Sequence, residues 1–214
     1  TDHVDYEPCA EKQTMVFDPE KYSAEYDDLE VPGLKIRRGI EFGILPDNAA
    51  QFQAELAKRH YDFVLGSVHF ADGLDVYFEP FWRGKTVHEV ERRYLEEMLT
   101  CVQNHDAFDV LAHLSFISKA SANTTHSLLK YADHREIVDE ILKVLVRKGK
   151  GMEMNTSGVD RVGGFLPTQD FFRRFKELGG EIVTVGSDAH NVERVGQYTD
   201  RACQIMKDIF GYVC

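Results

Sequence analysis

The sequence predicts an α/β fold in one domain, with parallel strands arranged as a barrel. Apolar segments of strand length alternate with longer segments of helical periodicity, which is the order typical of a parallel sheet. Imidazole and carboxylate side chains recur directly after the strand-like segments, and the carboxyl ends of barrel strands meet at one mouth. The 214 residues, 43% of them hydrophobic, suffice for one such core. An open doubly wound sheet is the alternative, but it would gather ligands at a single switch point.

Composition and charge restrict the classes of function. The formal net charge is -11 and no run of Lys or Arg is present, which argues against a nucleic-acid surface because phosphate backbones are bound by clustered cations. No apolar run approaches the roughly 20 residues of a membrane span, and the first residues lack the pattern of a signal peptide. The cysteines are scattered without paired spacing: Cys9, Cys101, Cys203 and Cys214. We therefore expect a cytoplasmic protein with reduced thiols, without a disulfide framework or a thiolate zinc site.

The first part of the chain contains an irregular segment followed by two strands. Residues 5–32 are polar and have no clean period, so we expect a loop with one short helix. Residues 35–44 alternate as a strand does, and residues 46–48 (Pro-Asp-Asn) provide turn and cap chemistry for a helix that reaches about Arg59. Residues 62–67 are a short apolar run typical of a buried strand.

The middle of the chain combines a long connection with a capped helix. Residues 70–85 contain two glycines and a proline, and a connection of this length often carries function when it lies over a pocket. Tyr77 and Trp82 are expected to pack within it, with a place in the wall of the pocket as the alternative. The segment Thr86-Val87-His88-Glu89 has the spacing of a capping box, which predicts a helix from there to about Gln103.

The remaining elements alternate regularly between strand and helix. Apolar side chains recur at helical spacing over residues 133–148, with Ile137, Ile141, Leu142 and Leu145 on one side. The other expected elements are strands at 108–112, 151–154 and 181–185, a helix capped by Thr168 that ends near Gly179, and a last helix from about 192 to 210. The chain then has five strands. The charge runs at 89–93 and 173–174 are expected to face solvent.

Six side chains near the ends of strand-like segments or at the chain's start offer imidazole and carboxylate donors and no sulfur. They are His3, Glu41, His69, His113, Asp188 and His190. This donor set suits zinc, manganese or iron, and six ligands can hold two or three divalent ions. Ions about 3.5–4 Å apart can activate a water, neutralise phosphoryl oxygens and stabilise a leaving alkoxide, so the set favours phosphoester hydrolysis. The other histidines lack this placement and are expected at the surface: His60, His88, His105, His126 and His134.

Glu41 is the natural bridging ligand, because a carboxylate has two oxygens to share. It lies in an alternating strand and could instead face solvent. In that case Ile40 and Phe42 would point inward, whereas the glycines at 39 and 43 indicate a close approach of the backbone. We therefore predict that Glu41 is a ligand.

Several motifs occur in an order that is found in one protein superfamily. They are Thr1-Asp2-His3, Gly39-Ile40-Glu41-Phe42-Gly43, Gly66-Ser67-Val68-His69-Phe70, Ala112-His113-Leu114, Glu153-Met154-Asn155-Thr156-Ser157-Gly158 and Gly186-Ser187-Asp188-Ala189-His190. With them, nearly the whole chain resembles the polymerase-and-histidinol-phosphatase (PHP) superfamily. Ser67, the loop at 75–78 and the run at 155–158 favour its histidinol-phosphate phosphatase branch over the polymerase-associated one.

The resemblance implies a distorted seven-stranded β/α barrel, a single domain over residues 1–214 with up to three metal ions. It implies that the six side chains above are ligands and that Asp188 and His190 also assist proton transfer. Lys119 and Arg161 are the cations implied for the phosphate, and Asn155 is a further candidate for substrate binding. The family begins with a strand that ends in His-x-His, a helix and a second strand before Thr-Asp-His, so we expect the parent protein to have about 30 to 40 further residues.

The activity implied is metal-dependent hydrolysis of L-histidinol phosphate to L-histidinol and phosphate, in histidine biosynthesis. The expected partner is a small phosphate ester, with no nucleic acid and no membrane. Two alternatives stay open: a PHP phosphoesterase that acts on nucleotides or other small phosphate esters, and a degenerate, non-catalytic metal-binding module.

Overall fold

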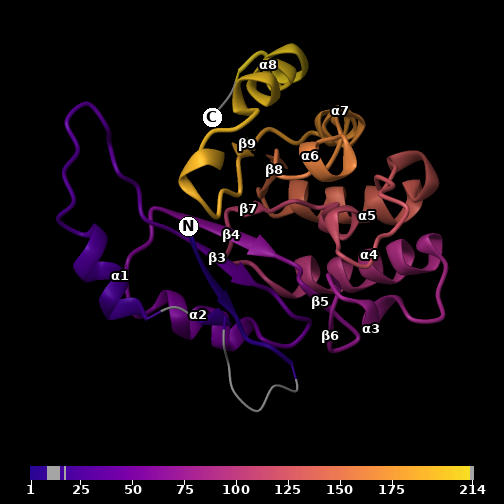
Figure 1. The fold of residues 1–214 in the computed structure, drawn as a ribbon, viewed down its shortest axis with the longest axis horizontal. Helices are drawn as coiled ribbons and strands as arrows, with labels where there is room; N and C mark the ends of the chain where they lie inside the picture. The colour runs from indigo at the N-terminus through magenta and orange to yellow at the C-terminus, as the bar shows by residue number, and fades with distance from the viewer. Residues whose placement is uncertain (9–14, 17, 213–214) are drawn as a thin grey trace.

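The computed structural model describes residues 1–8, 15–16 and 18–212, and its centre is a seven-stranded sheet of order β2-β1-β3-β4-β7-β8-β9 (Figure 1). These strands are β1 (Asp2–Asp5), β2 (Met15–Val16), β3 (Gly39–Gly43), β4 (Phe63–Ser67), β7 (Val110–Leu111), β8 (Gly151–Asn155) and β9 (Val183–Gly186). All neighbouring pairs are parallel except β1 and β2. Apart from β2, the strand order follows the chain order, which is the progression of a β/α barrel and not of a doubly wound sheet.

The sheet curls so that its two ends face each other. Residues of β1, β3 and β4 line one side of a cavity of about 980 Å³, and residues of β8 and β9 line the other side. Within the described ranges, no ladder joins β9 to β1 or β2, so the hydrogen bonding between strands stops short of a closed ring. The expected β/α barrel class is confirmed as this curled, mostly parallel sheet.

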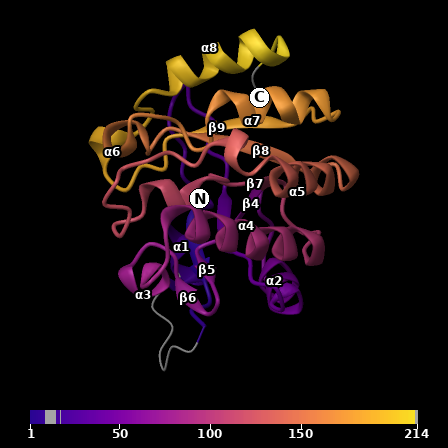
Figure 2. The same ribbon diagram turned by 90° about the vertical axis from the view of Figure 1, so that its right-hand side faces the viewer.

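Helices cover the outer face of the sheet. They are α1 (Pro19–Tyr26), α2 (Ala49–Leu56), α3 (Glu79–Trp82), α4 (Val87–Asn104), α5 (Arg135–Arg147), α6 (Val159–Val162), α7 (Gln169–Glu177) and α8 (Thr199–Phe210), with 3-10 turns η1 (Phe116–Lys119), η2 (Tyr131–Asp133) and η3 (Val192–Arg194). Helix α4 packs against α5, α5 against α7 and α7 against α8, so these helices follow one another around the strands (Figures 1 and 2).

Strand β3 illustrates how the sequence separates the two faces of the sheet. Ile40 and Phe42 are fully buried, and Phe42 stacks on Phe52 of α2 with ring centroids 3.9 Å apart. Glu41, between them, lines the inner cavity. The alternation therefore places the apolar side chains beneath the helices and the carboxylate inside the barrel.

The long connection expected after β4 contains a small hairpin of its own, with β5 (Phe70–Ala71) antiparallel to β6 (Leu74–Asp75). Asp72 and Gly73 both have positive φ at its tip, as a tight two-residue hairpin turn requires. Trp82 packs within the connection as expected, and its indole Nε1 donates to the Val76 carbonyl at 2.8 Å.

Several predicted helix features are confirmed and one helix is corrected. Thr86 and Glu89 form a capping box at the start of α4, and the four apolar side chains predicted on one side of α5 are all buried. Thr168 occupies the cap position of α7, although its hydroxyl bonds to the Asp170 carboxylate instead of the backbone. The expected helix at 192–210 is wrong in its first half, because Gly196 and Tyr198 have positive φ and separate η3 from α8.

The prediction of five strands is also corrected, since the main sheet has seven. Segment 5–32 contains the expected short helix, α1, but also the two-residue strand β2, and β1 precedes it. Most residues of β1 are polar. Its ladder to β3 and the ion pairs of Asp5 with His3 and His69 hold it in place. A short, mostly polar strand of that kind carries no periodic signal in the sequence.

No described helix combines the length and the apolar character that crossing a membrane requires. Cys101 is buried and Cys203 is partly buried, and both are free thiols. Cys9 and Cys214 lie outside the described residues.

Candidate functional site

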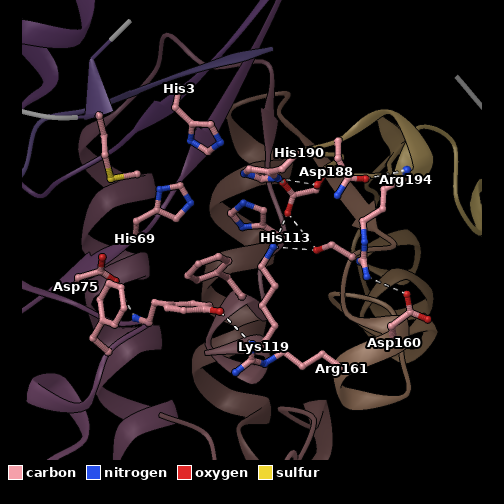
Figure 3. A pocket seen from close by; sticks show the side chains of 16 residues that line it. His3, His69, Asp75, His113, Lys119, Asp160, Arg161, Asp188, His190 and Arg194 are labelled. Atoms are coloured by element: carbon pink, nitrogen blue, oxygen red, sulfur yellow. Dashed lines mark hydrogen bonds and ion pairs between the residues drawn. The ribbon is translucent and has the colours of Figure 1, made fainter. Parts of the chain in front are cut away.

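A cavity of about 710 Å³ lies at the carboxyl ends of the parallel strands, where barrel proteins carry their sites (Figure 3). Its wall contains both imidazoles and cations. The imidazoles belong to His3, His69, His113 and His190, and the cations to Lys119, Arg161 and Arg194. His3, Asp188 and His190 also line the 980 Å³ cavity inside the barrel, so these side chains lie where the two cavities adjoin.

Glu41 is the centre of the buried part of the site. Its position on β3 is in register with His3 on β1, which places both side chains on the same face of the sheet. Its Oε1 accepts a hydrogen bond from Ser67 Oγ at 2.6 Å and lies 3.0 Å from His113 Nε2 and 3.4 Å from His69 Nε2. Burial works against the ionised form, but the hydrogen bonds from His113 and His69 hold the pKa of Glu41 well below its usual range. Glu41 is therefore a carboxylate among imidazoles.

Asp5 is a site residue that sequence reasoning missed. It is fully buried on β1, with one oxygen 2.8 Å from His69 Nδ1 and the other 3.3 Å from His3 Nδ1. Gly43 leaves it space, because a Cβ there would meet Asp5 Oδ1 at 2.0 Å. Burial opposes its ionisation, yet His69 and His3 lower the pKa of Asp5. The signal that could have found it is its spacing of two from His3, which puts both side chains on one face of a strand.

The same contacts act on the imidazoles. Burial disfavours the charged ring, but the carboxylates of Asp5 and Glu41 raise the pKa of His69 to about 10. His3 is affected in the same direction: burial lowers its pKa, while the hydrogen bond to Asp5 and the charge of Glu41 outweigh that effect and raise it. The raised pKa of each ring favours its protonated form, with which a cation would have to compete.

Glu153 of β8 is a second residue that the sequence did not single out. Its Oε2 accepts hydrogen bonds from the His113 backbone N–H at 3.0 Å and from Asn155 Nδ2 at 3.3 Å. Gly186 makes room for it, since a Cβ there would meet Glu153 Oε1 at 2.0 Å. Burial raises the pKa of Glu153. This carboxyl group fixes the backbone of His113, whose φ is positive.

Asn155, predicted to bind substrate, lines the inner cavity and not the 710 Å³ cavity. Its Oδ1 accepts from the Ser157 N–H at 2.9 Å and from Ser157 Oγ at 2.6 Å. The contacts that the structure gives to Asn155 therefore position Glu153 and Ser157.

Asp188 follows β9 and has a positive φ. Its side chain faces the cavity next to that of Lys119 (Figure 3). Its Oδ2 accepts hydrogen bonds from the Lys119 ammonium group and from Ser157 Oγ, the latter at 3.1 Å. Lys119 Nζ also donates to Ser157 Oγ at 2.9 Å. Burial would raise the pKa of Asp188, but the neighbouring Lys119 charge lowers it.

His190 is the most exposed of the predicted ligands, with 70% of its side chain accessible. Its Nδ1 lies 3.0 Å from the Asp188 carbonyl and 3.6 Å from Asp188 Oδ1. The His190 and His3 rings are 5.8 Å apart, which brings the loop after β9 next to the first strand.

The donor atoms fall into three overlapping groups in which all ligand atoms lie within 4.8 Å of one another. The groups are His3, Asp188 and His190; His3, Asp5 and His69; and Glu41, His69 and His113. All six predicted ligands occur in them. In addition, Nδ1 of His113 is buried without a hydrogen-bond partner among the described atoms, which is rare for a polar atom and fits a cation ligand. These residues could hold divalent metal ions.

Cations form the outer part of the cavity. Arg161 Nη1 donates to Tyr77 OH at 3.0 Å, and its guanidinium lies 5.5 Å from the centroid of the same ring. Arg194, which the sequence did not single out, lies 3.3 Å from Asp160 through Nη2. Lys119 completes the set, so three cations from separate segments face one space (Figure 3).

Two of the histidines expected at the surface are buried, and the expectation is wrong for them. His105 Nε2 donates to the Leu45 carbonyl at 2.7 Å, and His134 pairs with Glu91, which lies in a charge run expected to face solvent. Both histidines lie directly at helix ends, where a polar side chain finds a local partner that periodicity does not reveal. His60, His88 and His126 are exposed as expected.

Comparison with known proteins agrees with this geometry. Residues 1–157 match the family described as the PHP domain. A probable histidinol-phosphatase of Clostridium acetobutylicum is 32% identical over 196 residues, which cover 92% of this chain and 75% of that protein. A histidinol-phosphatase of Lactococcus lactis is 33% identical over 175 residues, 81% of this chain and 63% of its own length. A similar solved structure is the crystal structure of the histidinol phosphate phosphatase from Lactococcus lactis, complexed with zinc, L-histidinol and phosphate. It superposes with a TM-score of 0.79 at 30% sequence identity. The match covers 98% of this chain and 80% of that chain.

Proposed function

The chain belongs to the PHP domain family, and from that premise we propose that it is a metal-dependent phosphomonoesterase that hydrolyses L-histidinol phosphate to L-histidinol and phosphate, a step of histidine biosynthesis. One observation carries the proposal: the wall of a single cavity contains members of all three donor groups together with three cations. The zinc, L-histidinol and phosphate bound to the similar Lactococcus lactis enzyme support it. We assign the activity to one domain over residues 1–214.

We propose that the cavity holds two or three divalent ions through six side chains, with Glu41 as the shared ligand. The ligands are His3, Glu41, His69, His113, Asp188 and His190. When bound, such ions would supply Lewis-acid stabilisation of phosphoryl charge and lower the pKa of water in the site. Zinc, manganese and iron all accept this set of nitrogen and oxygen donors.

Hydrogen bonds with neighbouring side chains orient these ligands. Asp5 accepts from the Nδ1 atoms of His69 and His3, which fixes both rings and leaves their Nε2 atoms facing Glu41. Ser67 holds Glu41 from the other side. Carboxylates that orient metal-binding imidazoles also raise their basicity.

Lys119, Arg161 and Arg194 bind the phosphoryl oxygens in this proposal. Charge-assisted hydrogen bonds from guanidinium and ammonium groups are the usual means of holding phosphate, and all three groups face the cavity. The pair Asp188 and His190 would move a proton to the leaving alcohol, since His190 is accessible to solvent and lies beside the carboxylate. Asp75, in the cavity wall, offers a carboxylate for the ammonium group of the substrate.

A comparison of substrates tests the proposal. We expect phosphate release with reconstituted zinc, manganese or iron, and a kcat/KM for histidinol phosphate well above those for nucleoside monophosphates and simple aryl phosphates. Loss of release on chelation and its return with metal would support the metal requirement. A clear preference for nucleotides would overturn the substrate assignment, and absence of release with every ester and metal would favour a non-catalytic module.

A further inference from the structure

A second group of side chains that could bind a metal ion lies outside the cavity, between helices α4 and α5. His88 and Glu91 are on the first turns of α4, three residues apart and hence on one face, and His134 caps the start of α5. The two helices pack against each other along their length, as Figures 1 and 2 show. Neither of the two cavities of the candidate site includes any of these three residues.

The donor atoms of this group already lie close together. His134 Nε2 is 2.9 Å from Glu91 Oε2, and the rings of His88 and His134 stack with centroids 4.5 Å apart. One atom from each of the three residues lies within 4.8 Å of the other two. Ligand atoms of a tetrahedral zinc ion are about 3.3–3.5 Å apart. Binding would therefore widen the 2.9 Å separation of His134 and Glu91 slightly and bring His88, whose ligand atom lies within 4.8 Å of both, closer to them. His88 is exposed and can make that movement by rotating its side chain.

Among the described residues, the ion pair of Glu91 is with an imidazole and not with a lysine or arginine. Glu91 is 7% exposed and His134 4% exposed, at a packed interface between helices. No lysine or arginine among the described residues forms an ion pair with Glu91, whose one hydrogen bond is with His134. A buried carboxylate is costly unless it is paired or coordinates a metal. A divalent cation held by Glu91 and the two imidazoles would stabilise this buried carboxylate further.

We propose that His88, Glu91 and His134 form a separate zinc site that joins the start of α4 to the start of α5. Two imidazoles and one carboxylate are a common set of three zinc ligands, and the exposed side of His88 leaves the fourth position to water. Binding would replace the hydrogen bond between His134 Nε2 and Glu91 by coordination of both atoms to the ion. Because the residues do not line the cavity of the phosphatase site, the ion would lie apart from that site, and the inference does not depend on the proposed function.

Zinc stoichiometry and thermal unfolding test this site. Metal-free full-length protein would be dialysed against zinc and analysed for bound metal, together with His88→Ala and the matched control His60→Ala, which alters an exposed histidine outside every metal-type group. We expect His88→Ala to bind one equivalent less than the unaltered protein, to keep its phosphatase activity and to lose part of the rise in Tm that zinc produces. His60→Ala should match the unaltered protein in all three.

The same comparison in a His69→Ala background separates this ion from those of the cavity. We expect the remaining zinc to fall by one further equivalent when His88→Ala is added. Equal zinc stoichiometry with and without His88→Ala, in both backgrounds, would overturn the proposal and leave a buried histidine–glutamate hydrogen bond. Glu91→Gln provides a second variant, and because His88 is exposed the test does not depend on the folding of that buried substitution.

Discussion

The two halves of the candidate site differ in how they are built. The half formed by β1, β3, β4 and the end of β7 places its donors on strands or directly after them, and its central residues Asp5, Glu41, His69 and His113 are buried and bonded to one another. The half formed by η1 and the segments after β8 and β9 places its groups on loops and short helices, where Arg161, His190 and Arg194 are partly or largely accessible to solvent. Strand positions fix a side chain more tightly than loop positions do.

The chemistry of the two halves follows the same division. The strand half contains carboxylates and imidazoles, which suit ions that need fixed ligand positions, and the loop half contributes the three cations, which suit a phosphate that arrives and leaves. Substitutions in the strand half should therefore act on metal binding. Substitutions of the three cations in the loop half should act on substrate, with the metal content unchanged.

The largest effect is expected for His69→Ala. This imidazole belongs to two of the three donor groups, so its loss should remove metal and lower turnover by at least about a hundredfold. Metal content and phosphate release would be measured together, with the exposed His60→Ala as control. Unchanged turnover of a fully metal-loaded His69→Ala protein would show that His69 is not a ligand of the ions that turnover requires.

Asp5→Asn should give a smaller effect of the same kind. The amide keeps the shape of the side chain but cannot accept from both His69 and His3 with full charge, and removal of such an orienting carboxylate costs about 10 to 100-fold in metal affinity. Competition with a chelator of known affinity measures the change. Asp2→Asn, an exposed aspartate on the same strand, should leave the affinity as it is. Equal affinities for the two variants would remove Asp5 from the site.

Arg161→Ala should separate the effect on substrate from the effect on metal most clearly. Loss of a charged hydrogen bond to phosphate predicts a fall in kcat/KM of about tenfold or more, while bound metal stays constant. Arg173→Ala, an exposed arginine on α7, is the matched control and should change neither quantity. If Arg161→Ala lost metal instead, this arginine would support the ion-binding structure and its assignment to phosphate would fail.

The sequence predicted the strand half better than the loop half, for physical reasons. Imidazoles and carboxylates placed after apolar runs report the ends of strands, and the six predicted ligands do meet in the structure. Asp5 lies in a polar segment and Glu153 in a longer motif, so neither stands out in the sequence. The role of each depends on a partner on another strand or loop, His69 for Asp5 and the His113 backbone for Glu153. Arg194 lies on a 3-10 turn after a loop, where no periodic pattern indicates which way a side chain points.

The buried pair of Glu91 and His134 shows the same limit outside the site. The charge run at 89–93 predicts a solvated helix face, yet Glu91 turns toward α5 because His134 offers a hydrogen bond at the helix start. Such a pair depends on two segments separated by 43 residues, so neither segment alone contains the information. The capping box at Thr86 and Glu89, by contrast, is local and was found from spacing.

The smallest predicted effect concerns the pH dependence of stability without metal. Asp5 and Glu41 raise the pKa of His69 to about 10 from an ordinary value of 6.5, despite its burial. A group whose folded-state pKa is raised contributes stability that is fully present below its unfolded pKa and is lost as the pH rises through the folded value. We therefore expect the Tm of the chelator-treated protein to decrease between pH 6.5 and about 10.

The control for this decrease is His69→Asn, which cannot take up the proton and should have a shallower slope over the same range. Zinc should also reduce the slope in the unaltered protein, because the ion replaces the proton on the same imidazole. The loop half responds in the opposite sense, since Lys119 lowers the pKa of Asp188 and that contribution is lost only in acid. Circular dichroism melts at several pH values measure both, and an identical slope in His69→Asn would mean that the charge on this imidazole does not stabilise the strand half.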